Sequence, residues 1–117
     1  MVKMRNKYGA KKVEVNGEKF DSKLEHSRWC GLLVAEKAGL ISELKRQVPF
    51  ILAPSVKFYD EKRALPPMKY IADFTYIENG VLVVEDSKGV QTPDFRIKRR
   101  LMITVHGIQI RLTGARK

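Results

Sequence analysis

Cysteine and histidine are scarce in this sequence, and their scarcity excludes several kinds of site. The one cysteine, Cys30, excludes an internal disulfide and a multi-cysteine zinc site. The two histidines, His26 and His106, lack the His/Cys spacing of zinc ligands, so we expect both at the surface or at helix ends. No glycine-rich phosphate loop is present, which argues against an ATP-driven enzyme.

Long apolar runs and negative charge are also scarce. No segment approaches the roughly 18 apolar residues of a membrane span, and residues 1–12 lack the apolar stretch of a signal peptide. We therefore expect a cytoplasmic protein without a membrane partner. The 23 Lys and Arg outnumber the 13 Asp and Glu, which gives a net charge of +10 and favours a nucleic acid partner. A basic ribosomal-type protein would show the same balance.

Apolar residues make up 44% of the chain, enough for one folded domain over residues 1–117. Asn16-Gly17 predicts a tight hairpin turn, and Gly39 a helix end. Ser22 (or Asp21) and Thr92 are helix caps. We expect an arm (1–12), a hairpin (13–20), a helix (within 20–40), an edge strand (41–54), a short strand (56–59), a second hairpin (69–78 and 81–88), a helix (93–106) and a strand (107–113). This order predicts an α/β fold with a mixed sheet.

Two aspartates are predicted to face each other in the second hairpin, "YIADFTYIENGVLVVEDSKGV" (70–90). The Asn-Gly pair at 79–80 predicts a two-residue turn, so opposing residues lie equally far from it. Asp73 and Asp86 are such a pair, and their Cβ atoms should lie roughly 4.5–5.5 Å apart. A three-residue loop would instead place Asp73 against Glu85 or Ser87. The face of the two aspartates should also carry an apolar strip, namely Ile71, Thr75, Ile77, Leu82 and Val84.

Opposed carboxylates in a partly buried position repel, so a compensating cation is required. Lys88 points to the same face as Asp86, and a plain ion pair between them is one alternative. The other alternative is a divalent cation, which we favour, because two carboxylates with open positions for water suit Mg²⁺ or Mn²⁺.

A third acidic residue, Glu25, fits two descriptions. Ser22-x-x-Glu25 has the spacing of a capping box, which would account for Glu25 completely. Helical spacing also aligns Glu25 with the apolar stripe of the first helix, so its side chain should point inward. Glu36 falls on the same stripe, together with Trp29, Leu32, Leu33 and Leu40. Trp29 and Cys30 are expected in the core.

These residues resemble the signature of the PD-(D/E)XK nuclease superfamily. The signature places an acidic residue in the first helix (Glu25), an Asp on a strand (Asp73) and [Asp/Glu]-x-Lys on the next strand (Asp86-Ser87-Lys88). The usual proline before the first Asp is replaced here by Ala72. The order of elements over residues 22–112 resembles the restriction-endonuclease-like αβββαβ core of that superfamily.

Within the superfamily, "SKLEHSRW", "YIADF" and "VVEDSKG" look similar to a short phage-encoded group related to endonuclease-I-type Holliday junction resolvases and TnsA-like nucleases. The resemblance implies a metal-dependent endonuclease that hydrolyses phosphodiester bonds in branched DNA. A resolvase cuts two strands, so we expect a homodimer, in the host cytoplasm if the chain is phage-encoded.

The resemblance also implies roles for individual residues. Asp73 and Asp86 would hold Mg²⁺ (or Mn²⁺), Glu25 would complete the metal site, and Lys88 would orient or help deprotonate the attacking water. Glu85 is a reserve candidate if the register slips. In some relatives a polar residue of the strand after the first helix enters the site, and Gln47 could do so here, but a surface or strand-pairing glutamine is the favoured interpretation.

Basic residues form three groups that would contact DNA phosphates without reading sequence. The candidate DNA-binding residues are Lys3, Arg5, Lys7, Lys11 and Lys12 in the arm and Lys98, Arg99 and Arg100 in the second helix; Arg111, Arg116 and Lys117 form the third group. No element for base readout is evident, which favours structure-selective cleavage. The alternatives are an exonuclease or nicking nuclease of the same fold and a non-catalytic DNA-binding protein.

Overall fold

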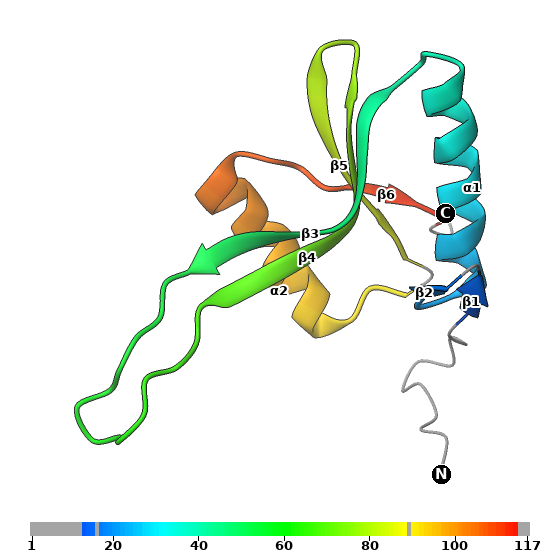
Figure 1. Ribbon diagram of the computed structural model, residues 1–117. Helices are drawn as coiled ribbons and strands as arrows, with labels where there is room; N and C mark the ends of the chain where they lie inside the picture. The colour runs from blue at the N-terminus through cyan, green and yellow to red at the C-terminus, as the bar shows by residue number, and fades with distance from the viewer. Residues whose placement is uncertain (1–12, 16, 89, 115–117) are drawn as a thin grey trace, which may run out of the picture.

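The computed structural model describes residues 13–15, 17–88 and 90–114 (Figure 1). The elements are β1 (Val13–Val15), β2 (Glu18–Phe20), α1 (Lys23–Lys37), β3 (Ser42–Ala53), β4 (Met68–Glu78), β5 (Val81–Ser87), α2 (Pro93–Leu101), the π-helical turn η1 (Met102–His106) and β6 (Arg111–Thr113). From α1 onward this is the predicted αβββαβ order, preceded by the predicted hairpin. The fold is α/β with a mixed sheet.

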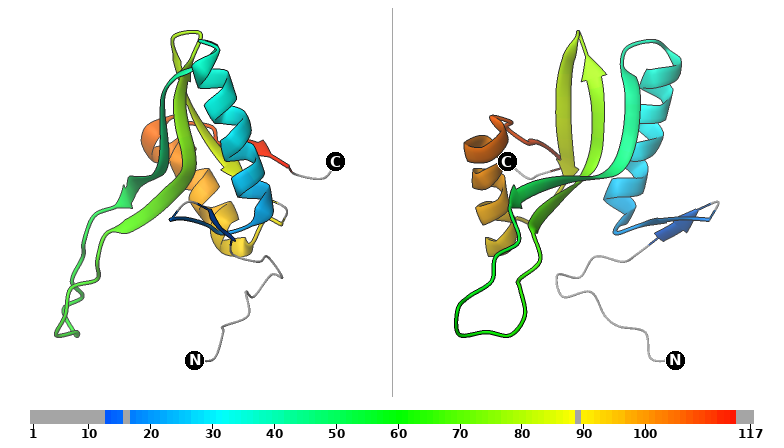
Figure 2. Two further views of the ribbon diagram at one scale, coloured as in Figure 1. Left: turned by 45° about the vertical axis from the view of Figure 1, so that its right-hand side comes forward. Right: turned by 60° about the vertical axis from the view of Figure 1, so that its left-hand side comes forward.

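Four strands form the main sheet in the order β3-β4-β5-β6. The pairs β3–β4 and β4–β5 are antiparallel and β5–β6 is parallel, so β3 lies at an edge as predicted. Helix α1 covers one face, and α2 with η1 covers the other (Figures 1 and 2). Among the described residues, no helix is long and apolar enough to span a membrane.

Local signals set the helix boundaries much as predicted. The Ser22 hydroxyl accepts a hydrogen bond from the backbone N–H of Glu25 (3.1 Å), and the Thr92 hydroxyl accepts one from Phe95 (3.1 Å). Gly107 ends the second helical segment with a φ of 68°. That segment is not one α-helix, because it changes to a π-helical turn at Met102. The consecutive β-branched residues 103–105 crowd an α-helix, which favours this change.

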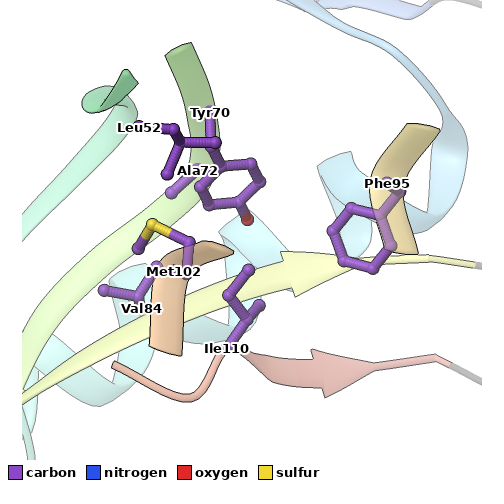
Figure 3. Packing of buried hydrophobic residues seen from close by; sticks show 7 residues of the cluster. All are labelled: Leu52, Tyr70, Ala72, Val84, Phe95, Met102 and Ile110. Carbon is purple, nitrogen blue, oxygen red and sulfur yellow. The ribbon is translucent and has the colours of Figure 1, made fainter. Parts of the chain in front are cut away.

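The sheet separates two hydrophobic cores. The α1-side core consists of Leu32, Ile41, Phe74, Tyr76 and Val83, with Trp29 packed against it. The α2-side core consists of Leu52, Tyr70, Ala72, Val84, Phe95, Met102 and Ile110 (Figure 3). Because both faces are covered, the middle of β4 is buried on both sides.

Near Asp73, the side chains of strand β4 switch from one face of the sheet to the other. Tyr70 and Ala72 pack in the α2-side core, whereas Phe74 and Tyr76, which also have even numbers, pack in the α1-side core. Alternation along the strand is therefore interrupted at Asp73. Gln47, opposite Asp73 on β3, has a φ of 54°, a left-handed backbone that bends the strand. Figure 1 shows that β3 and β4 bend together.

Several predictions about individual elements were wrong. The apolar strip beside the aspartates is not continuous, because Ile71 and Leu82 are exposed and only Thr75 and Val84 are buried. Leu33 and Cys30 on α1 are exposed, because the helix contacts the sheet along a narrower stripe, and Leu40, which lies beyond the end of α1, is exposed as well. Residues 56–59 form no strand, and Val56 makes only an isolated bridge with Leu65.

Candidate active site

The two aspartates meet where the β4–β5 ladder ends. Its pairs run from Glu78↔Val81 to Phe74↔Glu85, which confirms the predicted two-residue turn and register. Asp73 and Asp86 are the next residues of their strands. The backbone N–H of Ser87 donates to Asp73 Oδ2 (2.9 Å), so Asp73 is held against β5.

Asp86 is almost completely buried, with 1% of its surface exposed. The Tyr70 hydroxyl donates to Oδ2 (2.5 Å), and Lys88 Nζ lies 3.3 Å from Oδ1. Oδ1 itself is buried and accepts no hydrogen bond among the described residues. One oxygen of Asp86 is therefore fixed by Tyr70, and the other is left to a cation.

Glu25 is a cap and an inward-pointing residue at once. Its Oε1 accepts from the backbone N–H of Asp21 (2.9 Å), one residue before the N-cap Ser22, whereas a regular capping box would use the N–H of Ser22. Its Oε2 accepts from Gln47 Nε2 (3.0 Å) and lies 3.7 Å from Arg46 Nη2. Glu25 is nonetheless only 1% exposed. Gln47 thus contacts the cluster, which is the less favoured of its predicted roles.

The charges of the three carboxylates act on one another, and at Asp73 and Glu25 they are not fully compensated. Burial, together with the charges of Asp86 and Glu25, raises the pKa of Asp73 to about 8. Burial, and to a smaller degree the charges of Asp21 and Asp86, raises the pKa of Glu25. The charge of Arg46 lowers the pKa of Glu25, but it does not outweigh these effects.

The donor set suits a hard divalent cation. Carboxylate oxygens are the ligands that Mg²⁺ and Mn²⁺ prefer, and Asp86 Oδ1 is a buried acceptor without a hydrogen bond. The described residues contain no group of three or more His, Cys, Asp or Glu arranged to ligate one ion. Mg²⁺ usually keeps several waters and takes only one or two carboxylates from the protein, so Asp73 and Asp86 fit it. Glu25, which Gln47 and Asp21 hold, would act through water.

The reserve candidate Glu85 lies on the opposite face of β5. Arg28 binds it through Nε (2.6 Å) and Nη2 (3.0 Å), and the Tyr76 hydroxyl also donates to it. Burial alone would raise the pKa of Glu85, but these hydrogen bonds outweigh burial and lower it. Glu85 is a neutralised structural residue and not a member of the cluster.

The predicted DNA-binding residues fall into two sets. Lys3, Arg5, Lys7, Lys11 and Lys12 lie outside the described residues, as do Arg116 and Lys117. On α2, Lys98 pairs with Asp94 (3.6 Å) rather than with the carboxylates, and Arg99 donates to Gln91 (3.2 Å). Arg100 is exposed.

Sequence reasoning missed two residues of the site. Tyr70 binds Asp86, yet regular alternation from Asp73 places it on the other face, so no pattern pointed to it. Arg46 lies over the Phe20 ring (3.9 Å from Cζ to the centroid), donates to Lys19 O and approaches Glu25. Its position next to Gln47 was the only available signal.

The remaining candidates have local partners. His26 Nε2 lies 3.6 Å from Cys30 Sγ in an exposed contact within α1. His106 Nε2 lies 2.8 Å from the Ile51 carbonyl oxygen. Trp29 is partly buried and stacks on Phe74 with ring centroids 5.9 Å apart, so it lies at the border of the core in which it was predicted. None of these side chains reaches the carboxylates.

Comparison with known proteins assigns a family without assigning an activity. Among curated proteins, no sequence matches this one significantly. One family model, described as "Protein of unknown function (DUF1064)", matches residues 5–116. The match covers nearly the whole sequence, so the chain belongs to the DUF1064 family.

Proposed function

We propose that this protein is a metal-dependent, structure-selective DNA endonuclease of the PD-(D/E)XK type, acting on branched DNA such as a Holliday junction. The observation that carries the proposal is the buried group of Asp73, Asp86 and Glu25 with Lys88 beside Asp86. Buried carboxylates that repel one another destabilise a fold, and such groups concentrate at functional sites.

The chain's own side chains suit phosphodiester hydrolysis. A bound Mg²⁺ would polarise the scissile phosphate and lower the pKa of a bound water. Tyr70 holds Oδ2 of Asp86, which leaves the buried Oδ1 without a hydrogen bond and available to a metal ion. Lys88, about one-third exposed, can hold a water and offset charge that develops on the phosphate.

Charge supports DNA as the substrate. The net charge of +10 favours a polyanion, and the exposed Arg100 on α2 offers phosphate contact. The basic residues would contact phosphates, which carry no sequence information, and this favours recognition of shape over sequence.

The test uses an end-labelled four-way junction and a linear duplex of the same sequence, each with Mg²⁺, Mn²⁺ or EDTA. We expect paired, metal-dependent nicks near the junction, absent for Asp86→Asn. Equal cutting of both substrates would indicate an exonuclease or a nicking nuclease instead. Binding without cleavage under any metal would overturn the enzymatic proposal.

One observation favours a second candidate, a DNA-binding protein without catalysis. Lys88 Nζ lies 3.3 Å from Asp86 Oδ1, so the lysine already compensates part of the charge. The pKa of Asp73 remains raised despite that ion pair, which is why we rank this candidate second.

A further inference from the structure

The connection between β3 and β4, residues 54–67, is a finger that projects from the layered body in every view (Figures 1 and 2). All fourteen of its residues are exposed. It packs against neither core, so the fold does not need its side chains. A projecting segment with its own internal order is a candidate contact element.

The finger is internally ordered. Val56 and Leu65 exchange both backbone hydrogen bonds, and the Ser55 hydroxyl donates to the Leu65 carbonyl oxygen. The three prolines at 54, 66 and 67 restrict the backbone at its base. At the tip, the N–H of Glu61 donates to the Phe58 carbonyl oxygen (3.1 Å), which closes a turn.

The tip presents aromatic rings to solvent. Tyr59 occupies the turn and is 100% exposed, and the neighbouring Phe58 is half exposed. An exposed tyrosine at the end of an ordered projection can contact a partner on both faces of its ring. Stacking on nucleic acid bases uses such faces and is tolerant of sequence, since every base has a π-face.

Cations flank these rings. Lys57, Lys62 and Arg63 lie within four residues of Tyr59, beside the acidic residues Asp60 and Glu61 at the turn. No salt bridge among the described residues engages the three cations. Aromatic rings with adjacent cations are the combination that holds single-stranded nucleic acid, with rings on bases and cations on phosphates. A contact between protein copies would instead have to desolvate those charges.

The length of the finger relates it to the carboxylates. Twelve residues separate Gln47 from Tyr59, and at about 3.3 Å per residue they reach at most about 40 Å. One turn of duplex DNA spans about 34–36 Å. A substrate cut at the carboxylates would thus meet the finger within about one helical turn.

We propose that the finger is a second nucleic-acid contact, in which Tyr59 and Phe58 stack on unpaired bases of the substrate. This deepens the proposed function, on which it rests for the choice of DNA as the polymer. It assigns the substrate class as DNA that combines a duplex with unpaired bases within about one turn of the cut.

The experiment measures binding in EDTA, so that cleavage plays no part. The probes are a duplex with a five-nucleotide single-stranded gap, carrying 2-aminopurine in the gap, and the fully paired duplex. For Tyr59→Ala we expect about tenfold weaker binding to the gapped probe, less than about twofold change on the paired duplex, and loss of the 2-aminopurine fluorescence change. Tyr59→Phe should behave like the wild type, and Val34→Ala, an exposed apolar position on α1, is the matched control.

Equal losses on both probes, or none, would overturn the inference. So would sedimentation data in which Tyr59→Ala dissociates an oligomer, because the finger would then be a contact between protein copies. The two proposals fail separately. Tyr59-dependent gap binding without any metal-dependent cleavage would remove only the nuclease proposal, and cleavage with gap binding indifferent to Tyr59 would remove only this one.

Discussion

Glu85 and Asp86 are neighbours in β5 and are equally hidden from solvent, but their surroundings differ. Glu85 is bound by Arg28, Tyr76 and Thr113, so each oxygen has hydrogen-bond donors. Asp86 has Tyr70 on one oxygen and an ion pair without a hydrogen bond on the other. One face of the strand therefore holds an acid whose charge is compensated. The other face holds an acid with one buried oxygen that accepts no hydrogen bond.

The difference separates two uses of a buried carboxylate. Hydrogen bonds lower the pKa of Glu85 against the effect of burial, whereas burial and neighbouring charges raise the pKa of Asp73 beside Asp86. A satisfied buried network makes a fold specific. An unsatisfied one costs stability and persists where a ligand completes it. Substitutions on the two faces should thus affect different properties.

The largest effect is expected for Asp86→Asn. Cleavage of a four-way junction should fall at least about 10³-fold, equivalent to about 4 kcal/mol of transition-state stabilisation. The midpoint of thermal unfolding should stay unchanged or rise, because the substitution removes one of the negative charges that repel one another. A matching loss of stability would mean that Asp86 is structural like Glu85, and the comparison between the two faces would fail.

The reverse result is expected for Glu85→Gln. It leaves Arg28 without its charged partner, and breaking a buried pair costs about 3 kcal/mol at the low end of the usual range. The low end applies because the Arg28 side chain is 37% exposed. Urea unfolding measures the loss. Cleavage per folded molecule should stay near the wild-type value at a temperature where both proteins are folded, and a large loss there would place Glu85 in the site.

A pH-dependent effect is expected for Asp73→Asn. Since the pKa of Asp73 is about 8 in the fold and near 3.8 in the unfolded chain, the folded state binds more protons between these values. The contribution of Asp73 to the free energy of unfolding is thus fully present below about pH 4 and is lost as the pH rises through 8. Asp73→Asn should remove that slope and raise the thermal midpoint at pH 8 by about 5 °C, the equivalent of about 1 kcal/mol.

Added Mg²⁺ provides the control for that experiment. In the wild type it should raise the midpoint at pH 8 and release protons, because it competes with the proton on Asp73. It should have little effect on Asp73→Asn. Equal stabilisation of both proteins would show that the ion binds elsewhere.

The sequence predicted what local signals determine. The caps at Ser22 and Thr92 and the turn at 79–80 depend on neighbouring residues, and the register that gathers Asp73 and Asp86 follows from that turn. The side chains of β4 switch faces at Asp73 because of a bend that two strands share. Regular alternation of side chains along β4 therefore predicted the wrong neighbours for the aspartates. For the same reason, the contact of Tyr70 with Asp86 could not be predicted.

The smallest effect is expected at Gln47, where the bend and the carboxylate cluster meet. A non-glycine residue in the left-handed region costs about 1–2 kcal/mol, and glycine relieves this but loses more entropy on folding. Gln47→Gly should therefore change the free energy of unfolding by less than about 1 kcal/mol. It removes the hydrogen bond to Glu25 Oε2, so cleavage should still fall by severalfold.

Gln47→Asn is the matched variant, because asparagine tolerates the left-handed backbone but is too short to keep the contact with Glu25. Unfolding and junction cleavage measured on both variants separate the backbone from the side chain. If both lose cleavage while both stay stable, the glutamine is held in its strained conformation for the sake of Glu25. If both unfold readily and cleave normally once folded, Gln47 belongs with Glu85 among the residues that stabilise the fold.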